Sequence, residues 1–503
     1  MNRRKIYVYK TLFWMLLVTG ASAILLYCFS TGISGNDFWW HAKTGEWICS
    51  NRAIPNKDIY SWYGVEHGFD WVAHEWLSEV IFWKLYQVCG DGGIYLFCLG
   101  LAALMILLLM FQIREYITEN CLLSVFYICM FCVVSSLFFY GRPQIFAFFL
   151  LYGELYCLYK YDKGRNTWCI YLIPAIALLW SNLHGGSSNL AYILILSTLL
   201  GGIKEWRIGR VYSEKWPLKK IVKMIVVLAL TVAAIFVNPV GGRQVFLYPY
   251  TNMADTIMLH VVSEWTAPDA KNVGEIICYF IPVFLLCFGI LFGKRDVKLR
   301  DALIMLLFML LFFRSARFII WFYISASFWA FPYGLSCRMK NPESILEKAI
   351  LVCFSILLAA GCCIGAKGCF DVYKNGNAVT RMLEESVLET VREEAPVRLF
   401  NDYNFGGALI YADIPVFIDG RADVYSQNGL LGDGISLMLM QQVNSEAETM
   451  IFDPEELIDR YNFDGFLIDA GRPLYAYLNS HEERYEKVLV TETAAYFRRL
   501  EQQ

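Results

Sequence analysis

Long apolar runs recur through the first part of the chain and are separated by shorter polar stretches. A helix needs about 20 apolar residues to cross a membrane, and somewhat fewer when other helices surround it. By this measure the sequence predicts about eleven spans. They lie near residues 8–30, 92–113, 121–140, 145–161, 168–182, 188–203, 221–237, 273–292, 301–313, 318–336 and 348–366. The pattern is typical of a polytopic α-helical membrane protein.

The pattern changes after residue 366, where short runs of alternating apolar and polar positions are interspersed with amphipathic ones. The runs VRLFNDY, PVFIDGRAD, DGFLID, EKVLVTE and AAYFRRL are typical of strands, and FGGALIYA, residues 435–462 and PLYAYLNSH are typical of helices. This alternation favours an α/β domain of about 110 residues with a largely parallel sheet. We therefore divide the chain into a transmembrane domain, residues 1–366, and a C-terminal α/β domain, residues 367–503.

Lysine and arginine concentrate in alternate loops, which marks the cytoplasmic side of a membrane protein. The basic stretches are the N-terminus, the turn near Lys163, residues 204–223, residues 294–300 and the stretch near Arg338. The loops that then face outward are 31–91, 141–144, 182–187, 238–272 and 314–317. Because the number of spans is odd, we expect a cytoplasmic N-terminus and an extracytoplasmic C-terminal domain.

The composition agrees with a membrane location, because 57% of the residues are hydrophobic and only 18% are charged. So few charges leave too little polar surface for a soluble globule of this size. The formal net charge of -3 argues against a nucleic-acid partner, since such proteins concentrate basic residues to neutralise phosphates.

The first outer loop, residues 31–91, is rich in tryptophan, histidine and acidic residues. Loops between spans are usually short, so a long loop of this composition indicates a site held at the membrane surface. Its candidate catalytic residues are Asp37, His41, Asp70, His74 and Glu75.

The spacing of these candidates suggests how they work together. Asp37 and His41 are four residues apart, as are Asp70 and His74, so on helices each pair would share one face. A carboxylate with a neutral imidazole can act as a base with its orienting partner, or as two metal ligands. Asp37 and His41 are therefore also candidate ligands of a divalent cation, Mg²⁺ or Mn²⁺. The alternative is that these residues cap short interfacial helices while the tryptophans form an aromatic belt.

Several motifs together give the chain a family resemblance. They are GNDFWWHAKTGEW, IPNKDIYSW and HEWLSEV in the first outer loop, GRPQIFAF at 141–148, WSNLHGG at 180–186, NPVGGRQVFLYPY at 238–250, SEWTAPD at 263–269, and NDYNFGGALIY with FIDGRADVY in the tail. In their order these pieces resemble the bacterial branch of the GT-C glycosyltransferases.

The resemblance covers nearly the whole chain and implies an integral membrane enzyme that takes a sugar from a polyprenyl-phosphate carrier outside the cytoplasmic membrane. In better-understood relatives, which include protein mannosyltransferases and lipid A aminoarabinose transferases, an acid in the first outer loop sits at the reaction centre. The resemblance gives this role to Asp37. Those relatives often have two neighbouring acids here, whereas this chain has Asn36 and Asp37, so a second carboxylate comes from elsewhere or is absent.

Four arginines lie at the outer ends of spans, where the orientation rule predicts few cations. They are Arg142, Arg243, Arg314 and Arg317, of which Arg142 and Arg317 are the first candidates and Arg243 the next. As a group they could bind the phosphate or pyrophosphate of a donor, because arginine offers a planar fork to its oxygens. The alternative is that each one reaches toward lipid headgroups.

Two further outer pairs are candidate substrate ligands. Asn182 and His184 end a span beside two glycines, which would let a substrate approach the backbone, although helix termination alone explains the glycines. Glu264 and Trp265 combine a carboxylate with an aromatic ring, which is a common way to hold a sugar.

The tail contributes Asp419 and Arg421, which lie at the end of a predicted strand, where open α/β sheets usually bind ligands. The alternative is a structural network in which Arg421 pairs with an acid. Gly406 and Gly407 follow another predicted strand but do not form a G-x-G-x-x-G fingerprint, so the sequence gives no reason to expect a nucleotide site.

These observations predict an inverting glycosyltransferase of the bacterial cytoplasmic membrane, with the inversion implied by the resemblance alone. Its partners would be a polyprenyl-phosphate sugar donor, membrane lipid and a cell-envelope acceptor. Two alternatives stay open. One is a transporter or lipid flippase, for which Glu154 is the clearest charge in the middle of a span. The other is a non-catalytic envelope assembly protein whose tail binds a partner.

Overall fold

The computed structural model describes residues 3–33, 35–117, 119–254, 257–258, 265–334, 345–375, 383–443 and 452–500. The chain packs into two compact units. Unit 1 contains residues 1–33, 88–242 and 267–379, and unit 2 contains residues 34–87, 243–266 and 380–503. Packing therefore groups the first outer loop with the tail. The division at residue 366 follows the hydrophobic pattern of the sequence instead of the packing.

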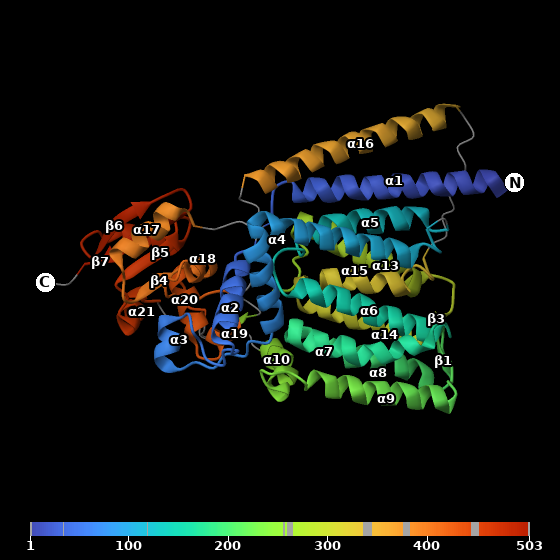
Figure 1. Ribbon diagram of the computed structural model, residues 1–503, viewed down its shortest axis with the longest axis horizontal. Helices are drawn as coiled ribbons and strands as arrows, with labels where there is room; N and C mark the ends of the chain where they lie inside the picture. The colour runs from blue at the N-terminus through green and yellow to red at the C-terminus, as the bar shows by residue number, and fades with distance from the viewer. Residues whose placement is uncertain are drawn as a thin grey trace. The chain divides into compact units, whose positions relative to one another are not determined.

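Unit 1 is almost entirely helical (Figure 1). Its helices are α1 (Arg3–Phe29), the later part of α4 (Trp76–Ile113), α5 (Cys121–Ser135), α6 (Gln144–Asp162), η1 (Thr167–Leu172), α7 (Ile173–Leu183), η2 (Gly185–Ser187), α8 (Leu190–Ile203), α9 (Leu218–Ile235), α12 (Val273–Glu275), η3 (Ile276–Phe280), α13 (Ile281–Phe292), α14 (Leu299–Arg314), η4 (Ala316–Phe318), α15 (Ile319–Trp329) and α16 (Ile345–Lys374). A small sheet in the order β1-β2-β3 joins their ends, with β1 at Trp206–Ile208, β2 at Val211–Ser213 and β3 at Val297–Lys298.

Within the described residues, a helix overlaps each predicted span. The stretches long and apolar enough to cross a membrane by length and composition are Trp76–Ile113, Gly185–Ile203, Val273–Phe292 and Ile350–Lys374. The protein is thus a helical membrane protein, whereas the number of eleven spans stays a prediction.

Helices α1 and α16 lie side by side because small residues let their backbones approach closely (Figure 1). A Cβ atom built on Gly365 of α16 would lie 2.9 Å from the backbone nitrogen of Tyr27, and one on Gly368 would lie 2.6 Å from Cβ of Ser30. The other side of α16 exposes large apolar side chains such as Ile364, which is 69% exposed. Such a surface suits contact with lipid chains.

Unit 2 combines helices from the first loop with a small sheet from the tail. Its helices are α2 (Asp37–Asn51), α3 (Trp62–His67), the start of α4, α10 (Gly242–Ala254), α17 (Glu385–Glu394), η5 (Tyr403–Phe405), α18 (Gly406–Tyr411), α19 (Ala422–Ser426), α20 (Leu430–Leu439), α21 (Pro454–Tyr461) and α22 (Pro473–Ser480). Its strands are β4 (Leu399–Asn401), β5 (Gly465–Asp469), β6 (Tyr485–Val490) and β7 (Ala494–Arg499). Within the described residues, four of the five predicted strands and the predicted helices at FGGALIYA and PLYAYLNSH are confirmed, whereas the predicted helix over residues 435–462 is replaced by parts of two helices, α20 and α21.

The prediction of a largely parallel sheet is wrong. The described strands run in the order β4-β5-β7-β6, and only β4 and β5 pair in parallel. Strand β7 pairs antiparallel with both β5 and β6. The turn of residues 491–493 is too short for a crossover, so β6 and β7 form a hairpin, and the sheet is mixed.

The predicted strand PVFIDGRAD is also wrong, because its backbone finds partners outside the sheet. Trp62 donates its backbone N–H to the carbonyl of Val416 at 2.9 Å, and Ser61 donates its hydroxyl to the carbonyl of Phe417 at 2.8 Å. Asn401 donates its side-chain amide to the carbonyl of Ile418 at 2.8 Å. The segment therefore runs between the first loop and β4, which ties two distant parts of the sequence together.

The N-terminus of α3 illustrates how the first loop is fixed. Ser61 caps α3 by accepting the backbone N–H of Gly64 at 3.1 Å, while Trp62 donates its indole N–H to the carbonyl of Leu399 at 3.0 Å. The aromatic rings of Trp62 and Phe417 lie 5.7 Å apart in the buried core of unit 2. The first loop and the tail share one hydrophobic core.

Candidate functional site

The candidate reaction centre of unit 2 begins with Asp37, the first residue of α2. An acid in the first turn is favoured there by the partial positive charge of the helix N-terminus. Helix α2 buries Trp39, Trp40 and His41, and ends at Arg52, which adopts a left-handed conformation with φ of 52°. Asp37 and His41 thus share a helical face, as their spacing predicts.

The Asp37 carboxylate lies against the backbone of Gly420. A Cβ atom at residue 420 would lie 2.1 Å from Oδ1 of Asp37 and 3.0 Å from Nε1 of Trp40, which no real side chain tolerates. A Cβ atom on Gly407 would likewise lie 2.2 Å from the carbonyl oxygen of Asn36. These glycines therefore bring the tail backbone into direct contact with the start of α2.

Beside Gly420 lies a buried ion cluster, which we call the Arg421 cluster and which contains Arg421, Asp419, Asp58 and Tyr425. The guanidinium donates from Nη1 to Asp58 at 2.8 Å, from Nε to Asp419 at 2.9 Å and from Nη2 to Asp419 at 2.6 Å. Nη2 also donates to the hydroxyl of Tyr425 at 2.6 Å, and that hydroxyl donates to Asp419. Arg421 therefore pairs with acids, as the structural interpretation of the tail expects.

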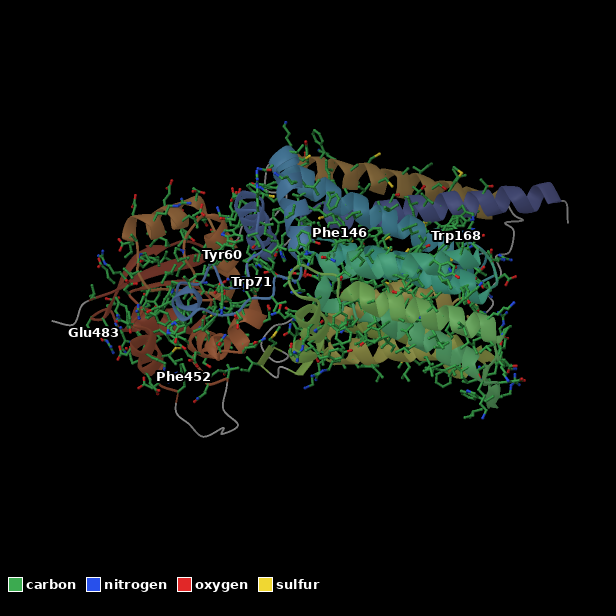
Figure 2. The ribbon with its side chains drawn as sticks, turned by 60° about the horizontal axis from the view of Figure 1, so that its bottom comes forward. Tyr60, Trp71, Phe146, Trp168, Phe452 and Glu483 are labelled. Carbon is green, nitrogen blue, oxygen red and sulfur yellow. The ribbon has the colours of Figure 1, made fainter. Side chains whose placement is uncertain are left out.

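The surroundings of Arg421 keep it charged although it is only 2% exposed. Burial disfavours the charge, but Asp419 and Asp58 outweigh burial and raise the pKa of Arg421 above its ordinary value. The guanidinium carbon also lies 4.6 Å from the ring centre of Trp71 and 4.8 Å from that of Tyr60. Both rings belong to the first loop and are labelled in Figure 2. The cluster is thus built from the first loop and the tail, two of the three sequence segments of unit 2.

A second polar group, which we call the imidazole cluster, consists of His41, His74, Glu75 and Glu79. Nδ1 of His41 is hydrogen-bonded to Oε1 of Glu79 at 3.3 Å, and its Nε2 lies 3.9 Å from Glu75. His74 lies 3.8 Å from Glu75 on the other side. Because Nδ1 of His74 lies 3.0 Å from the carbonyl of Val72, that nitrogen carries the proton, and Nε2 faces Glu75.

Tyr248 of α10 connects the imidazole cluster to the tail. Its ring lies 3.9 Å from that of His74, and its hydroxyl donates to the carboxylate of Asp423. Burial raises the pKa of Asp423 from 3.8 to about 6, although the Tyr248 hydrogen bond opposes the shift. Asp423 therefore titrates near neutral pH.

Asp70 occupies a different environment from the other loop candidates. Its side chain is 85% exposed and pairs with Lys57 at 2.6 Å. The expectation that Asp70 and His74 share a helix face is wrong, because residues 70–73 are not helical and Asp70 forms an antiparallel bridge with Lys57. Its assignment as a catalytic residue stays a prediction.

Four substrate candidates lie in unit 1. Arg317 donates to the side-chain oxygen of Gln144 at 3.5 Å, and Arg142 lies over the ring of Tyr140 at 5.0 Å. Arg317 thus contacts Gln144, the first residue of α6, which follows Arg142 by two positions. His184 and the indole N–H of Trp180 both bond the hydroxyl of Ser187, at 2.6 and 2.9 Å.

Asn182 donates to the carbonyls of Leu178 and Val237, at 2.8 and 3.1 Å, which connects α7 to the end of α9. In unit 2, Arg243 is exposed near the start of α10, and Trp265 packs against the core. Glu264 lies outside the described residues. The substrate-binding roles of all these residues stay predictions.

The proposed cation site consists of Asp37 and His41, which lie one helical turn apart in α2. Across the described ranges, no group of three or more His, Cys, Asp or Glu side chains could hold a metal ion. The imidazole cluster holds its acids and histidines at 3.3 to 3.9 Å from one another, so they pair among themselves. The divalent-cation site at Asp37 and His41 therefore stays a prediction.

Sequence reasoning missed Asp58, Glu79 and Tyr248. Glu79 follows Glu75 by four residues at the start of α4, so helical spacing could have found it. Asp58 and Tyr248 gave no local signal, because their partners Arg421 and Asp423 lie far away in the sequence.

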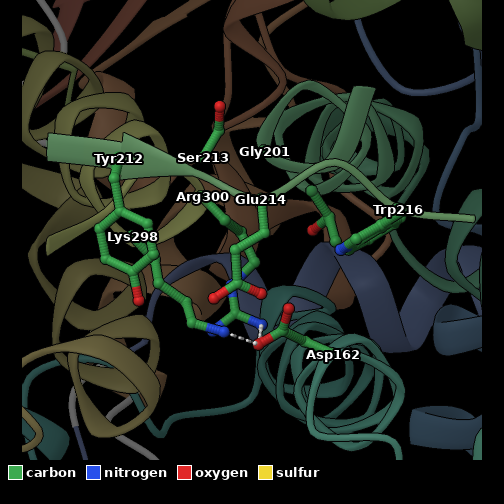
Figure 3. Close-up of a pocket in the computed structure, with 9 residues that line it drawn as sticks. Asp162, Gly201, Tyr212, Ser213, Glu214, Trp216, Lys298 and Arg300 are labelled. Atoms are coloured by element: carbon green, nitrogen blue, oxygen red, sulfur yellow. Dashed lines mark hydrogen bonds and ion pairs between the residues drawn. The ribbon is translucent and has the colours of Figure 1, made fainter. Parts of the chain in front are cut away.

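Unit 1 contains another polar cluster that the sequence did not indicate (Figure 3). Asp162 at the end of α6 contacts Lys298 at 3.1 Å and Arg300 at 3.2 Å, and Arg300 donates to Asp301 at 2.6 Å. Tyr212 and Trp216 line the same small hollow. Because its acids and bases pair with each other, this cluster connects α6 and α14 to the small sheet.

Comparison with known proteins identifies the fold. No family model and no curated protein matches the sequence. The oligosaccharyltransferase AglB from Archaeoglobus fulgidus, in complex with an inhibitory peptide and a dolichol-phosphate, is 11% identical, and the match covers 96% of this chain and 74% of that one with a TM-score of 0.55. The oligosaccharyltransferase of Archaeoglobus fulgidus in the apo form is 10% identical, with coverage of 91% and 69% and a TM-score of 0.53. ArnT from Cupriavidus metallidurans bound to undecaprenyl phosphate is 12% identical, with coverage of 96% and 97% and a TM-score of 0.44. At such low identity the two oligosaccharyltransferase matches concern the fold alone.

Proposed function

From the GT-C fold that the chain shares with the two oligosaccharyltransferase structures, we propose that the protein is a membrane glycosyltransferase. It moves a sugar from a polyprenyl-phosphate donor to a cell-envelope acceptor on the outer face of the bacterial cytoplasmic membrane. The observation that carries the proposal is the fold, and the placement of Asp37 at the start of α2 supports it. Fold alone does not imply function, so the proposal needs the chemistry of the site.

In the proposed reaction, an acceptor hydroxyl attacks the anomeric carbon of the donor sugar. The carbon–oxygen bond to the acceptor forms as the bond to the phosphate breaks, which inverts the configuration. Asp37 takes the proton of the hydroxyl as general base. The leaving phosphate departs on its lipid carrier.

Two arginines of unit 1 are the proposed ligands of the donor phosphate. Arg142 and Arg317 come from different sequence segments of unit 1, yet Arg317 contacts Gln144, two residues after Arg142. Their guanidinium groups would stabilise the charge that develops on the leaving phosphate. The proposed reaction needs no step on a divalent cation.

The proposal is tested by sugar transfer in membranes that contain the wild-type chain or Asp37→Asn. The membranes receive labelled polyprenyl-phosphate sugars and a cell-envelope extract as acceptor. Loss of a general base should lower transfer by about 10²- to 10⁴-fold. Glu492→Gln is the matched control, because Glu492 is an exposed acid in the turn between β6 and β7.

Each outcome bears on the proposal. Full transfer by Asp37→Asn at equal protein abundance would remove Asp37 from the mechanism. No transfer by the wild-type chain with any donor would count against a glycosyltransferase and favour a transporter or an assembly protein.

A further inference from the structure

The tail residues Asp419, Gly420 and Arg421 form a turn beside the start of α2. We propose that this turn holds the carboxylate of Asp37 in position for the transfer reaction. In this proposal Asp419, Arg421 and Asp58 are positioning residues. The inference rests on the proposed function, since it concerns how the proposed base is held. It makes the C-terminal segment part of the reaction centre and gives Asp419 and Arg421 a role other than substrate binding.

Gly420 has no side chain, so the backbone of the turn lies directly against the carboxylate of Asp37. A Cβ atom there would lie 2.1 Å from Oδ1 of Asp37, far inside van der Waals contact. The backbone of the turn therefore sets how far the carboxylate can move in that direction. On its other side, Gly407 packs just as closely on the carbonyl of Asn36. The start of α2 is thus confined by two glycines of the tail.

The turn is held rigid by several hydrogen bonds at Asp419. Asp419 receives two bonds from the guanidinium of Arg421, and its Oδ1 also accepts the backbone N–H of Arg421 at 2.9 Å. A Cβ atom on Gly406 would lie 2.4 Å from Cβ of Asp419, so the N-terminus of α18 packs directly against Asp419. Asp58 ties the cluster to the first loop at 2.8 Å. A fork held by several charge-assisted bonds has little freedom to move.

Arg421 has few guanidinium N–H donors left to bind a substrate. It makes four side-chain hydrogen bonds to Asp58, Asp419 and Tyr425. It is 2% exposed, and its guanidinium lies over the rings of Trp71 and Tyr60. We therefore infer that Arg421 acts on Asp37 by holding the turn that contains Gly420.

The decisive variant is Gly420→Ala, with Gly100→Ala as its matched control. No atom lies within 4 Å of a Cβ built on Gly100 in α4, so the control adds the same methyl group without a clash. A displacement of about 1 Å at a catalytic group can cost about 10²-fold in rate. We expect Gly420→Ala to lower kcat by about 10- to 100-fold while the KM for the donor stays within about twofold.

Two further readouts separate positioning from general destabilisation. In the Asp37→Asn background, adding Gly420→Ala should cause little further loss of the residual transfer, because both changes act on one carboxylate. Hydrogen exchange of the amides in the first turns of α2 should become faster in Gly420→Ala and in Arg421→Lys, but not in Gly100→Ala.

The exchange measurement does not depend on activity, so it distinguishes the two proposals. If the wild-type chain transfers no sugar, the proposed function fails. Hydrogen exchange in α2 then still tests whether the turn at Gly420 positions Asp37. Unchanged α2 exchange in both variants, or faster exchange throughout unit 2 in both, would overturn the positioning role. The positioning role would also be overturned if Gly420→Ala lowered transfer in the Asp37→Asn background by the same factor as in the wild-type background.

Discussion

The guanidinium of Arg421 donates a 2.8 Å hydrogen bond to Asp58, a residue 363 positions earlier in the sequence. Both side chains are almost completely buried, at 1% and 0% exposure. The pair connects the tail to the first outer loop inside unit 2. Because neither charge meets water, the cost of losing one partner should be large.

We expect Arg421→Met to destabilise the protein. The change keeps most of the apolar stem of the side chain but leaves Asp58 and Asp419 buried without their cation. Breaking a buried ion pair in this way costs about 3–5 kcal/mol. The measurement is the unfolding midpoint of the purified protein in detergent.

The control for Arg421→Met is Lys57→Met, which breaks the exposed pair with Asp70 at 2.6 Å. Water screens exposed pairs, so the midpoint should change little. A midpoint for Arg421→Met that equals or exceeds the wild-type value would show that the cluster does not stabilise unit 2.

Asp423 should make stability depend on pH. Burial raises its pKa to about 6 in the folded protein, whereas an unfolded aspartate titrates near 3.8. Between these values the folded state holds a proton that the unfolded state has lost. The stabilising contribution is therefore fully present below about pH 4 and is lost as the pH rises through about 6.

We expect Asp423→Asn to remove this dependence, because an amide does not ionise. Relative to the wild-type protein, the variant should gain on the order of 2 kcal/mol of stability between pH 4 and pH 7. Unfolding midpoints of both proteins across that range provide the test. Parallel pH profiles would show that Asp423 has an ordinary pKa.

The positions of helices in unit 1 could be predicted from the sequence because each long apolar run must satisfy its own backbone locally. The tail shows the limit of local patterns. Residues 415–423 alternate like a strand, but Ser61 and Trp62 of the first loop take the backbone carbonyls of Val416 and Phe417. No window of the tail alone contains that information.

In the candidate site, too, local sequence patterns identify some residues and miss others. Asp37 and His41 were within reach of sequence reasoning, since their spacing is helical and α2 contains both. Asp58 could not be found because its significance depends on Arg421. Gly420 gave a signal that sequence reasoning did not use, since a glycine between Asp419 and Arg421 indicates a close approach of backbone to another group.

Glu154 of α6 should be dispensable for sugar transfer. Its side chain is 0% exposed, and in the described part of the chain neither carboxylate oxygen has a hydrogen-bond partner. A buried polar group without a partner costs about 1–3 kcal/mol. We therefore expect Glu154→Met to raise the unfolding midpoint and to leave transfer near the wild-type level.

The control for Glu154→Met is Asp162→Asn at the end of the same helix, where Lys298 and Arg300 pair with the carboxylate and the midpoint should fall. A transporter would depend on a charge in the middle of its bundle. If Glu154→Met abolishes the activity of the protein without lowering its abundance, the transporter alternative gains over the glycosyltransferase.

Arg142 and Arg317 should determine affinity for the donor. A hydrogen bond to a charged group contributes about 1.5–3 kcal/mol, which corresponds to about a 10- to 100-fold change in binding. We therefore expect Arg317→Gln and Arg142→Gln each to raise the KM for a polyprenyl-phosphate sugar by at least tenfold, with a smaller effect on the KM for the acceptor. The control is Arg165→Gln, an exposed arginine in the loop after α6. Unchanged donor KM in both variants would mean that these arginines reach toward lipid headgroups, and the ligands of the donor phosphate would then have to come from other residues.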